Sequence, residues 1–235
     1  MGRNDIWAEV INIRGIFLTG QSENILFRVI YIHGLLSNGI GIFGNEEYRI
    51  SDIWVSDVFI EDCCNFYADY VSSRPRLEPG SDRKDQGLIA FYYVDNFIVT
   101  GSRLEKCRSD GTHFYFCNNG QFSENKVYSA QMGGYFLESC ENVTVSGNLI
   151  MNNGSRGVTI ERGSFRCTLT DNIICYSCWE WIWAPNWQES IIMGNVFEKN
   201  GQNPNGPEDH QIWNAYITVN ADDDPTNTFT KNYHY

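Results

Sequence analysis

The stretch NVTVSGNLIMNNGSRGVTIERG, residues 142–163, contains one unit of a pattern that recurs through most of the chain. Glycine marks one position of this pattern five times, and a tryptophan continues it: Gly39, Gly87, Gly111, Gly134, Gly157 and Trp181. The last three steps are 23, 23 and 24 residues long. A period of this length predicts a solenoid, in which each repeat hides its apolar face by stacking on its neighbours.

Aligning the repeats on the glycine reveals four apolar columns. Two of them read Phe27, Val55, Val99, Phe122, Val145, Leu169, Ile192 and Ile32, Ile60, Leu104, Val127, Ile150, Ile174, Phe197. The other two read Ile40, Leu88, Thr112, Tyr135, Val158, Ile182 and Ile42, Ala90, Phe114, Leu137, Ile160, Ala184. Apolar residues alternate at period two between short Asn, Asp and Gly turns, which predicts parallel strands without crossover helices. We therefore expect one all-β domain over residues 1–235, a single-stranded parallel β-helix of about seven coils of about 23 residues.

Residues 142–163 resemble a coil of the right-handed parallel β-helix of the pectate-lyase-like superfamily, and the resemblance covers residues 10 to about 220. It implies a carbohydrate partner, since these helices mostly serve polysaccharide lyases, hydrolases, epimerases and phage tailspikes. It also implies a secreted or extracellular protein. The chain lacks the vWiDH-like segment and paired Asp motif of pectate lyases, and the NTD, DD, GHG and RIK series of polygalacturonases. Those two activities are therefore not expected.

The net charge and the hydrophobicity of the sequence argue against some classes of partner. The net charge of −12 argues against nucleic acid and anionic membranes, because both need a cationic surface. The chain contains neither a run of 18 apolar residues nor a basic-then-apolar leader at its start. It opens almost directly into a β-coil, so we expect a missing N-terminal region or a partner subunit that caps the first coil. We expect no cofactor, with Ca²⁺ left open, and no metal site.

The cysteines allow two interpretations. Cys117 and Cys140 lie 23 residues apart, and Cys63 and Cys107 share another column. Adjacent rungs place Cα atoms about 4.8 Å apart, which is within disulfide range. We favour buried free thiols, which pack as small hydrophobic groups, and leave the two disulfides open. The lone Cys175–Cys178 pair is interpreted as structural.

Two long insertions precede the glycine position, at about residues 65–86 and 201–210. Both are expected to emerge from one edge and to wall a groove, because solenoid insertions on one face commonly mark the binding face. The segment 221–235 leaves the pattern and is expected to form an irregular tail.

Strand alternation predicts which side chains face outward beside this groove. One outward column reads Gly41, Ile89, His113, Phe136, Thr159, Trp183, and the next reads Phe43, Phe91, Tyr115, Glu138, Glu161, Pro185. Aromatic rings stack on the C–H faces of sugars and carboxylates bond to their hydroxyls, so this mixture is typical of a glycan groove. The alternative is that the inserted loops simply cover these aromatics.

The candidate catalytic residues are acidic groups and one histidine. Glu138 and Glu161 lie one rung apart, and two carboxylates at that spacing tend to separate into an acid and a base, as glycosidases require. Asp110, His113 and Asp85 form a second acid–base cluster near the glycine turns. Surface ion pairs with Arg162 or Arg156 and ordinary turn chemistry are the alternatives.

The candidate substrate-binding residues are aromatic and cationic: Tyr115, Phe136, Trp181, Trp183, Arg83, Lys84, Arg162 and His210. Trp181 and Trp183 are expected to point outward. A shift of one residue in the register would exchange the outward and inward side chains of this stretch. Basic residues of the first insertion suit a uronate carboxylate, or alternatively are solvated loop charges.

Three functions follow from these residues. The carboxylate pair favours a polysaccharide glycoside hydrolase, which we rank first. The basic insertion favours a uronate lyase or epimerase. A non-catalytic glycan-binding or structural β-helix, such as a spike or adhesin, remains the third.

Overall fold

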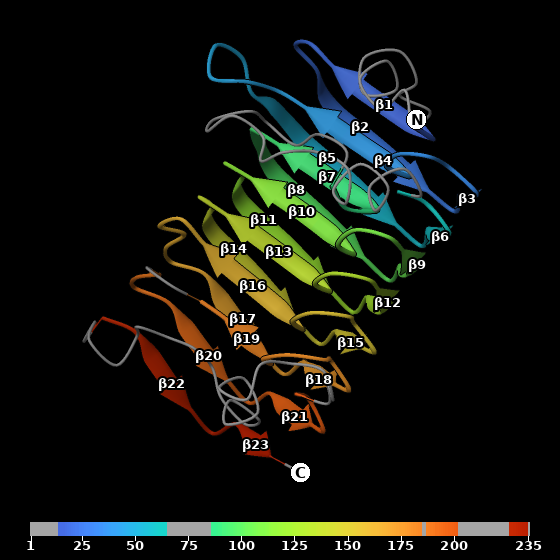
Figure 1. Ribbon diagram of the computed structural model, residues 1–235. Coiled ribbons are helices and arrows are strands. Elements are labelled where there is room, and N and C mark those ends of the chain that lie inside the picture. Colours follow the sequence, from blue (N-terminus) through green and yellow to red (C-terminus); the bar gives the residue numbers. More distant parts are fainter. Residues whose placement is uncertain (1–13, 65–85, 185–186, 202–225, 235) are drawn as a thin grey trace, which may run out of the picture.

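The computed structural model describes residues 14–64, 86–184, 187–201 and 226–234. Figure 1 shows their strands stacked into an elongated solenoid, with β1 near one end and β23 at the other. The described residues contain no helix, and every ladder is parallel. The all-β parallel β-helix of about seven turns is therefore confirmed.

Three parallel sheets run along the axis. Sheet A consists of β1 (Ile16–Thr19), β4 (Ile40–Phe43), β7 (Ile89–Tyr92), β10 (Thr112–Tyr115), β13 (Tyr135–Glu138), β16 (Val158–Glu161) and β19 (Ile182–Trp183). Sheet B consists of β2 (Glu23–Arg28), β5 (Ile50–Ser56), β8 (Val94–Thr100), β11 (Asn118–Ser123), β14 (Glu141–Ser146), β17 (Thr168–Thr170), β20 (Ile191–Met193) and β22 (Thr228–Thr230). Sheet C consists of β3 (Tyr31–His33), β6 (Phe59–Glu61), β9 (Arg103–Cys107), β12 (Lys126–Ala130), β15 (Leu149–Met151), β18 (Ile173–Cys175), β21 (Val196–Glu198) and β23 (Tyr233–His234).

The core lies between the three sheets. The two columns predicted from Phe27 and from Ile32 are the observed inward columns of sheets B and C, pair by pair along their ladders. Most members are fully buried, and Ile150 and Ile160 are 0% and 1% exposed. Such positions cannot be left empty, because stacked coils above and below pack against each side chain.

The register predicted for sheet A was wrong by one residue at β7. Ile40 pairs with Ile89 and Ile42 with Phe91, so Ile89 and Phe91 point inward and are fully buried. The reason is local. Gly87 adopts a φ of +88° at the end of the first insertion, and Leu88 takes the position that glycine holds in the other coils.

The glycine column has a steric cause. A Cβ at Gly134 would lie 2.4 Å from Cγ2 of Ile150, and one at Gly157 would lie 2.2 Å from Cγ2 of Ile174. In these two coils the turn from sheet C to sheet A therefore passes too close to the core for a side chain. Trp181 occupies this position in a later coil and stacks on Phe197 at 4.5 Å between centroids. It is 4% exposed, so the outward orientation predicted for Trp181 was wrong.

Buried asparagines hold the turn from sheet B to sheet C. Asn148 Nδ2 donates to the Phe122 carbonyl at 2.9 Å and to Asn172 Oδ1 at 2.8 Å. The same bonds recur from coil to coil and reach Asn232, which accepts from Asn195. This ladder supplies partners for backbone groups that a sharp turn would leave unpaired.

The end of the chain continues the solenoid. β22 pairs with β20 and β23 pairs with β21, so residues 226–234 form part of a further coil. The prediction of an irregular tail is therefore wrong for residues 226–234. The insertions predicted at 65–86 and 201–210 lie almost wholly outside the described residues, and the groove between them stays a prediction.

All eight cysteines lie in the described part of the chain, and they form no disulfide bond. Cys117 and Cys140 are neighbours in one column, as predicted, with the Cys117 N–H 3.4 Å from the Cys140 sulfur. The sulfurs instead contact backbone carbonyls, as Cys117 does at Phe91. The free-thiol interpretation agrees with this arrangement.

Candidate active site

A buried chain of polar side chains crosses three strands of sheet A. The Tyr92 hydroxyl lies 3.0 Å from His113 Nδ1, and His113 Nε2 lies 3.0 Å from Glu138 Oε2. Tyr92 and Glu138 belong to one outward column, on β7 and β13, and His113 reaches both from β10. All three side chains are nearly inaccessible, His113 being 3% exposed. Both ring nitrogens of His113 are therefore engaged.

The chain emerges at the surface through Arg162. Its guanidinium pairs with Glu138 Oε1, while its own side chain is 68% exposed. One oxygen of Glu138 thus pairs with the Arg162 guanidinium, and the other lies within hydrogen-bond distance of His113. A buried carboxylate held in this way has both oxygens paired and is fixed in one orientation.

Glu161 lies directly opposite Glu138 in the ladder of β13 and β16. Burial raises the pKa of the Glu161 carboxyl above its ordinary value, and the charge of Glu138 raises it further. Arg156 and Arg162 act in the opposite direction. Glu161 is half-buried, so part of its side chain is accessible to solvent. The predicted pair of neighbouring carboxylates is therefore present, with different surroundings for each member.

Aromatic side chains surround the pair. Phe136 stacks on His113 at 4.7 Å between ring centroids and covers it. Phe136, Tyr115 and Trp183 are each half-buried and present one ring face or edge to solvent. Trp183 lies under the Arg156 guanidinium at 4.5 Å, and Arg156 also pairs with the buried Glu180 at 2.9 Å. Part of the predicted aromatic surface is thus accessible.

Asp110, a predicted catalytic residue, is buried and held by hydrogen bonds in the turn before β10. Its carboxylate accepts from the Gly133 N–H at 2.7 Å and from Gln86 Nε2 at 2.5 Å, and the residue is 3% exposed. These bonds tie the turns of neighbouring coils together. The charge of Asp110 also contributes to the raised pKa of Glu161.

Four predicted site residues lie outside the described residues: Asp85, Arg83, Lys84 and His210. Tyr92, by contrast, was missed because the one-residue error at β7 put Phe91 in its place. The signal was available in the sequence. Aligning Leu88 with the glycines gives Ile89 and Phe91 inward, which is the more apolar choice. It also places Tyr92 in the outward column of Glu138, two rungs away.

The fold places the chain among the parallel β-helix proteins. The profile of one family, described as periplasmic copper-binding protein (NosD), matches residues 72–234, which is more than half of the chain. The chain therefore belongs to the NosD family. A search of curated proteins found no match.

Solved structures of similar fold include two mutants of the periplasmic alginate epimerase AlgG. They are 12% identical to this chain, with TM-scores of 0.66 and 0.63 over 94% of it. This chain spans 48% of the length of the epimerase chains. A GH136 lacto-N-biosidase from Eubacterium ramulus is 11% identical, with a TM-score of 0.48 over 94% of this chain and 45% of its own. At 12% identity the likeness to AlgG shows the fold alone.

The described residues do not fit the copper that the family description names. They contain no group of three or more His, Cys, Asp or Glu side chains that could hold a metal ion. His113 uses both ring nitrogens within the protein. Burial raises the pKa of Cys63 to about 11 and that of Cys167 to about 12, so these thiols are protonated near neutral pH and are poor ligands. No chemical step is assigned to copper.

No helix in the described part of the chain has the length and apolar character needed to cross a membrane.

Proposed function

We propose that this chain cleaves a polysaccharide at the outer face of sheet A, as a glycoside hydrolase that acts outside the cytoplasm. One observation carries the proposal. Glu161, whose pKa is raised, lies one rung from Glu138, which is held by a guanidinium and a histidine. Two carboxyl groups whose surroundings separate their protonation define a general acid beside an ionised partner.

Each group has a role in the reaction. Protonated Glu161 donates its proton to the glycosidic oxygen as the bond to the leaving sugar breaks. Ionised Glu138 stabilises the positive charge that develops at the anomeric carbon, and it acts as nucleophile or as base toward water. His113 and Tyr92 are positioning residues, because they fix the orientation of Glu138 without reaching the surface.

The surrounding aromatics support a sugar ligand. Tyr115, Phe136 and Trp183 are half-buried on the same face. Rings presented in this way bind the C–H face of a pyranose while leaving its hydroxyls for the carboxylates and for Arg162.

A second candidate, β-elimination or epimerisation of a uronate, is favoured by a different observation. Tyr92 and His113 form a hydrogen-bonded phenol–imidazole pair, which could move the proton alpha to a carboxylate. The exposed guanidinium of Arg162 would pair with that carboxylate. Both partners of the pair are buried, so this reaction requires movement of Phe136, and we rank it second.

The test is a panel of neutral and acidic polysaccharides assayed for new reducing ends and for near-ultraviolet absorbance of unsaturated uronides. We expect new reducing ends without that absorbance. Glu161→Gln and Glu138→Gln should each lower turnover by about 10²-fold or more, the usual contribution of a general acid or base. The surface variant Glu198→Gln is the matched control and should retain wild-type turnover.

Other outcomes assign other functions. Unsaturated products that disappear in Tyr92→Phe would replace the hydrolase with the lyase. A change of uronate stereochemistry without cleavage would indicate the epimerase. Binding without turnover of any polymer would leave a glycan-binding β-helix.

A further inference from the structure

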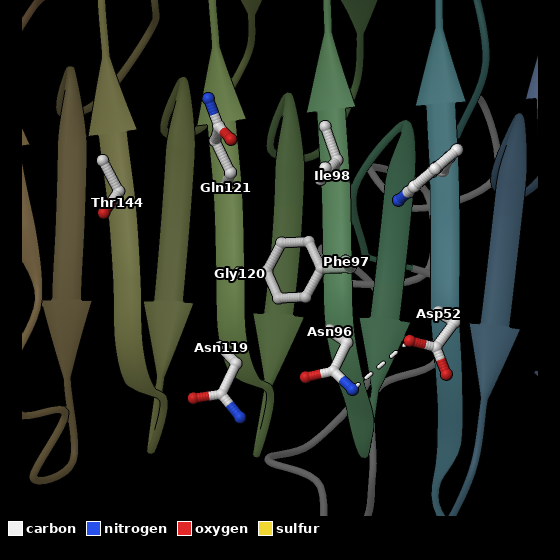
Figure 2. A pocket seen from close by; sticks show the side chains of 9 residues that line it. Asp52, Asn96, Phe97, Ile98, Asn119, Gly120, Gln121 and Thr144 are labelled. Carbon is white, nitrogen blue, oxygen red and sulfur yellow. Dashed lines mark hydrogen bonds between the residues drawn. The ribbon is translucent and has the colours of Figure 1, made fainter.

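A hollow lies on the outer face of sheet B, away from the carboxylate pair. It has a volume of about 510 Å³ and spans four successive strands, β5, β8, β11 and β14. Its lining consists of Asp52, Trp54, Asn96, Phe97, Ile98, Asn119, Gly120, Gln121 and Thr144. Figure 2 shows Asp52, Asn96 and Asn119 in one row across these strands, with Ile98, Gln121 and Thr144 in a parallel row.

The backbone explains why this face is hollowed. Asp52, Asn96, Asn119 and Asn142 each adopt a left-handed φ between 53° and 56° at the same level of their strands. These residues are skipped in the ladder, which pairs Ser51 with Asp95 and Ile53 with Phe97 on either side. Aspartate and asparagine tolerate this conformation better than most residues. One left-handed residue in every rung bends the whole sheet along one line.

The floor of the groove is backed by the core at Gly120. A Cβ at Gly120 would lie 2.0 Å from the Phe97 ring, so the ring fills the space of a side chain from the inside. Phe97 itself is 1% exposed and packs on Phe91 and Phe114 in the core. The base of the groove is therefore packed tightly against the core.

The groove wall carries an exposed indole. Trp54 is 54% exposed on β5, and its register partner Ile98 is half-buried on β8. The column continues through Gln121 to Thr144. Seven tryptophans occur in the chain, and Trp54 is the one among the described residues whose ring is mostly in solvent. A large aromatic ring exposed beside polar groups is typical of a binding surface.

The second wall supplies hydrogen-bonding groups. Asn96 Nδ2 donates to Asp52 Oδ1 at 3.3 Å, and Asn119 Oδ1 accepts from Asn142 at 3.2 Å. Each of Asn96 and Asn119 thus uses one atom of its amide within the ladder. Among the described residues the other amide atom has no partner, and both residues are exposed. These atoms lie at the spacing of the rungs, about 4.8 Å.

We propose that this groove binds an extended neutral polysaccharide that lies along the helix axis, as a site separate from the catalytic face. A sugar unit of an extended chain is similar in length to one rung, so successive units meet successive amides while one unit stacks on Trp54. None of the nine lining residues is cationic, and Asp52 is acidic, which excludes a polyuronate as the preferred ligand. Asp52 is engaged by Ser51 and Asn96, so the groove holds a ligand and does not react with it.

The test is affinity electrophoresis of the full chain in gels that contain mixed-linkage β-glucan, galactomannan, xylan or starch, with polygalacturonate and alginate as acidic polymers. The host protein is Glu161→Gln, so that the polymers stay intact and binding is measured apart from cleavage. We expect retardation by at least one neutral polymer. Trp54→Ala should weaken that binding by at least about tenfold and Gln121→Ala by less, while Ile191→Ala, an exposed apolar residue farther along the same face, should leave it unchanged.

The proposal is overturned if no neutral polymer retards the protein, if Trp54→Ala binds as tightly as its host, or if only acidic polymers bind. Loss of cleavage in Glu161→Gln with retained Trp54-dependent binding supports both sites. Retained cleavage in Glu161→Gln contradicts the proposed hydrolase. In that case the effect of Trp54→Ala on binding still decides whether the groove binds the polymer. Melting temperatures of all variants confirm that they fold.

Discussion

Glu138 and Glu161 are register partners on β13 and β16, yet their surroundings differ sharply. Glu138 is buried and paired with Arg162 and His113. Glu161 is half-buried, and its pKa is raised by burial and by the neighbouring carboxylate. Identical side chains one rung apart thus have different surroundings because the next residue, Arg162, turns back to pair with Glu138. Arg162 achieves this with a left-handed φ of 55°.

This difference predicts a pH-dependent stability. The folded protein binds a proton at Glu161 more tightly than the unfolded chain does, so its stability falls as pH rises from the ordinary glutamate pKa of about 4.3 through the raised value. The substitution Glu161→Gln removes the titrating carboxyl group and with it this loss of stability at higher pH. At pH 7 the variant should be more stable than wild type by at most about 1 kcal/mol, since the group is partly solvated.

Urea unfolding at pH 7 and at pH 4 measures the effect. The advantage of Glu161→Gln should shrink toward the lower pH, while Glu124→Gln, at an exposed position, should be neutral at both. A variant that is less stable than wild type at pH 7 and equal at pH 4 would mean that the ionised form of Glu161 is favoured by folding.

A second prediction compares two buried tyrosines. Tyr92 bonds to His113, and Tyr92→Phe would leave a buried ring nitrogen without its partner, which should cost about 1–3 kcal/mol. The Tyr135 hydroxyl is also buried but has no hydrogen-bond partner among the described residues. Tyr135→Phe should therefore be neutral or stabilising. Chemical denaturation of the two variants checks the opposite signs; equal losses would show that the Tyr92 bond contributes nothing specific.

Most of the fold could be predicted from the sequence because every coil has to satisfy the same packing requirement. Columns such as Ile150 above Ile174 depend only on period-two alternation, and those of sheets B and C were assigned without error. The error at β7 has a physical cause. Gly87 lies at the end of an insertion with a φ of +88°, and Leu88 takes the glycine position, so aligning Gly87 itself with the other glycines shifts the register by one residue.

The site was less predictable than the fold. Alternation placed His113, Glu138 and Glu161 on one outward face, but it cannot show which of them is covered. Phe136 lies in the same outward column as His113 and lies over it, so a predicted surface histidine is buried. The Tyr92 bond runs diagonally between columns, and a column-by-column alignment contains no information on such contacts.

The core prediction can be tested at one position with an internal control. Ile150 is fully buried between coils, and Ile150→Ala should lower the free energy of unfolding by about 2–5 kcal/mol. Ile173, on the neighbouring strand, is 44% exposed, so Ile173→Ala should cost under about 1 kcal/mol. Thermal or urea denaturation distinguishes them. Similar losses for both variants would contradict the inward assignment of Ile150.

The final prediction concerns the thiols. Burial raises the pKa of Cys63 and Cys175 to about 11 and that of Cys167 to about 12. A thiol with a pKa near 11 is about one part in a thousand thiolate at pH 8, and the thiolate is the form that alkylates. Cys178 is the one cysteine of the eight that is only half-buried.

Under native conditions at pH 8, iodoacetamide should therefore modify Cys178 first, and Cys178→Ser should abolish this early modification. In denaturant without reductant all eight cysteines should react, because none is held in a disulfide. Mass spectrometry of the intact and digested protein measures both results. A pair such as Cys117 and Cys140 that alkylates in denaturant only after reduction would show that adjacent coils are cross-linked. That result would favour the disulfide interpretation, which the spacing of one rung between these two cysteines allows.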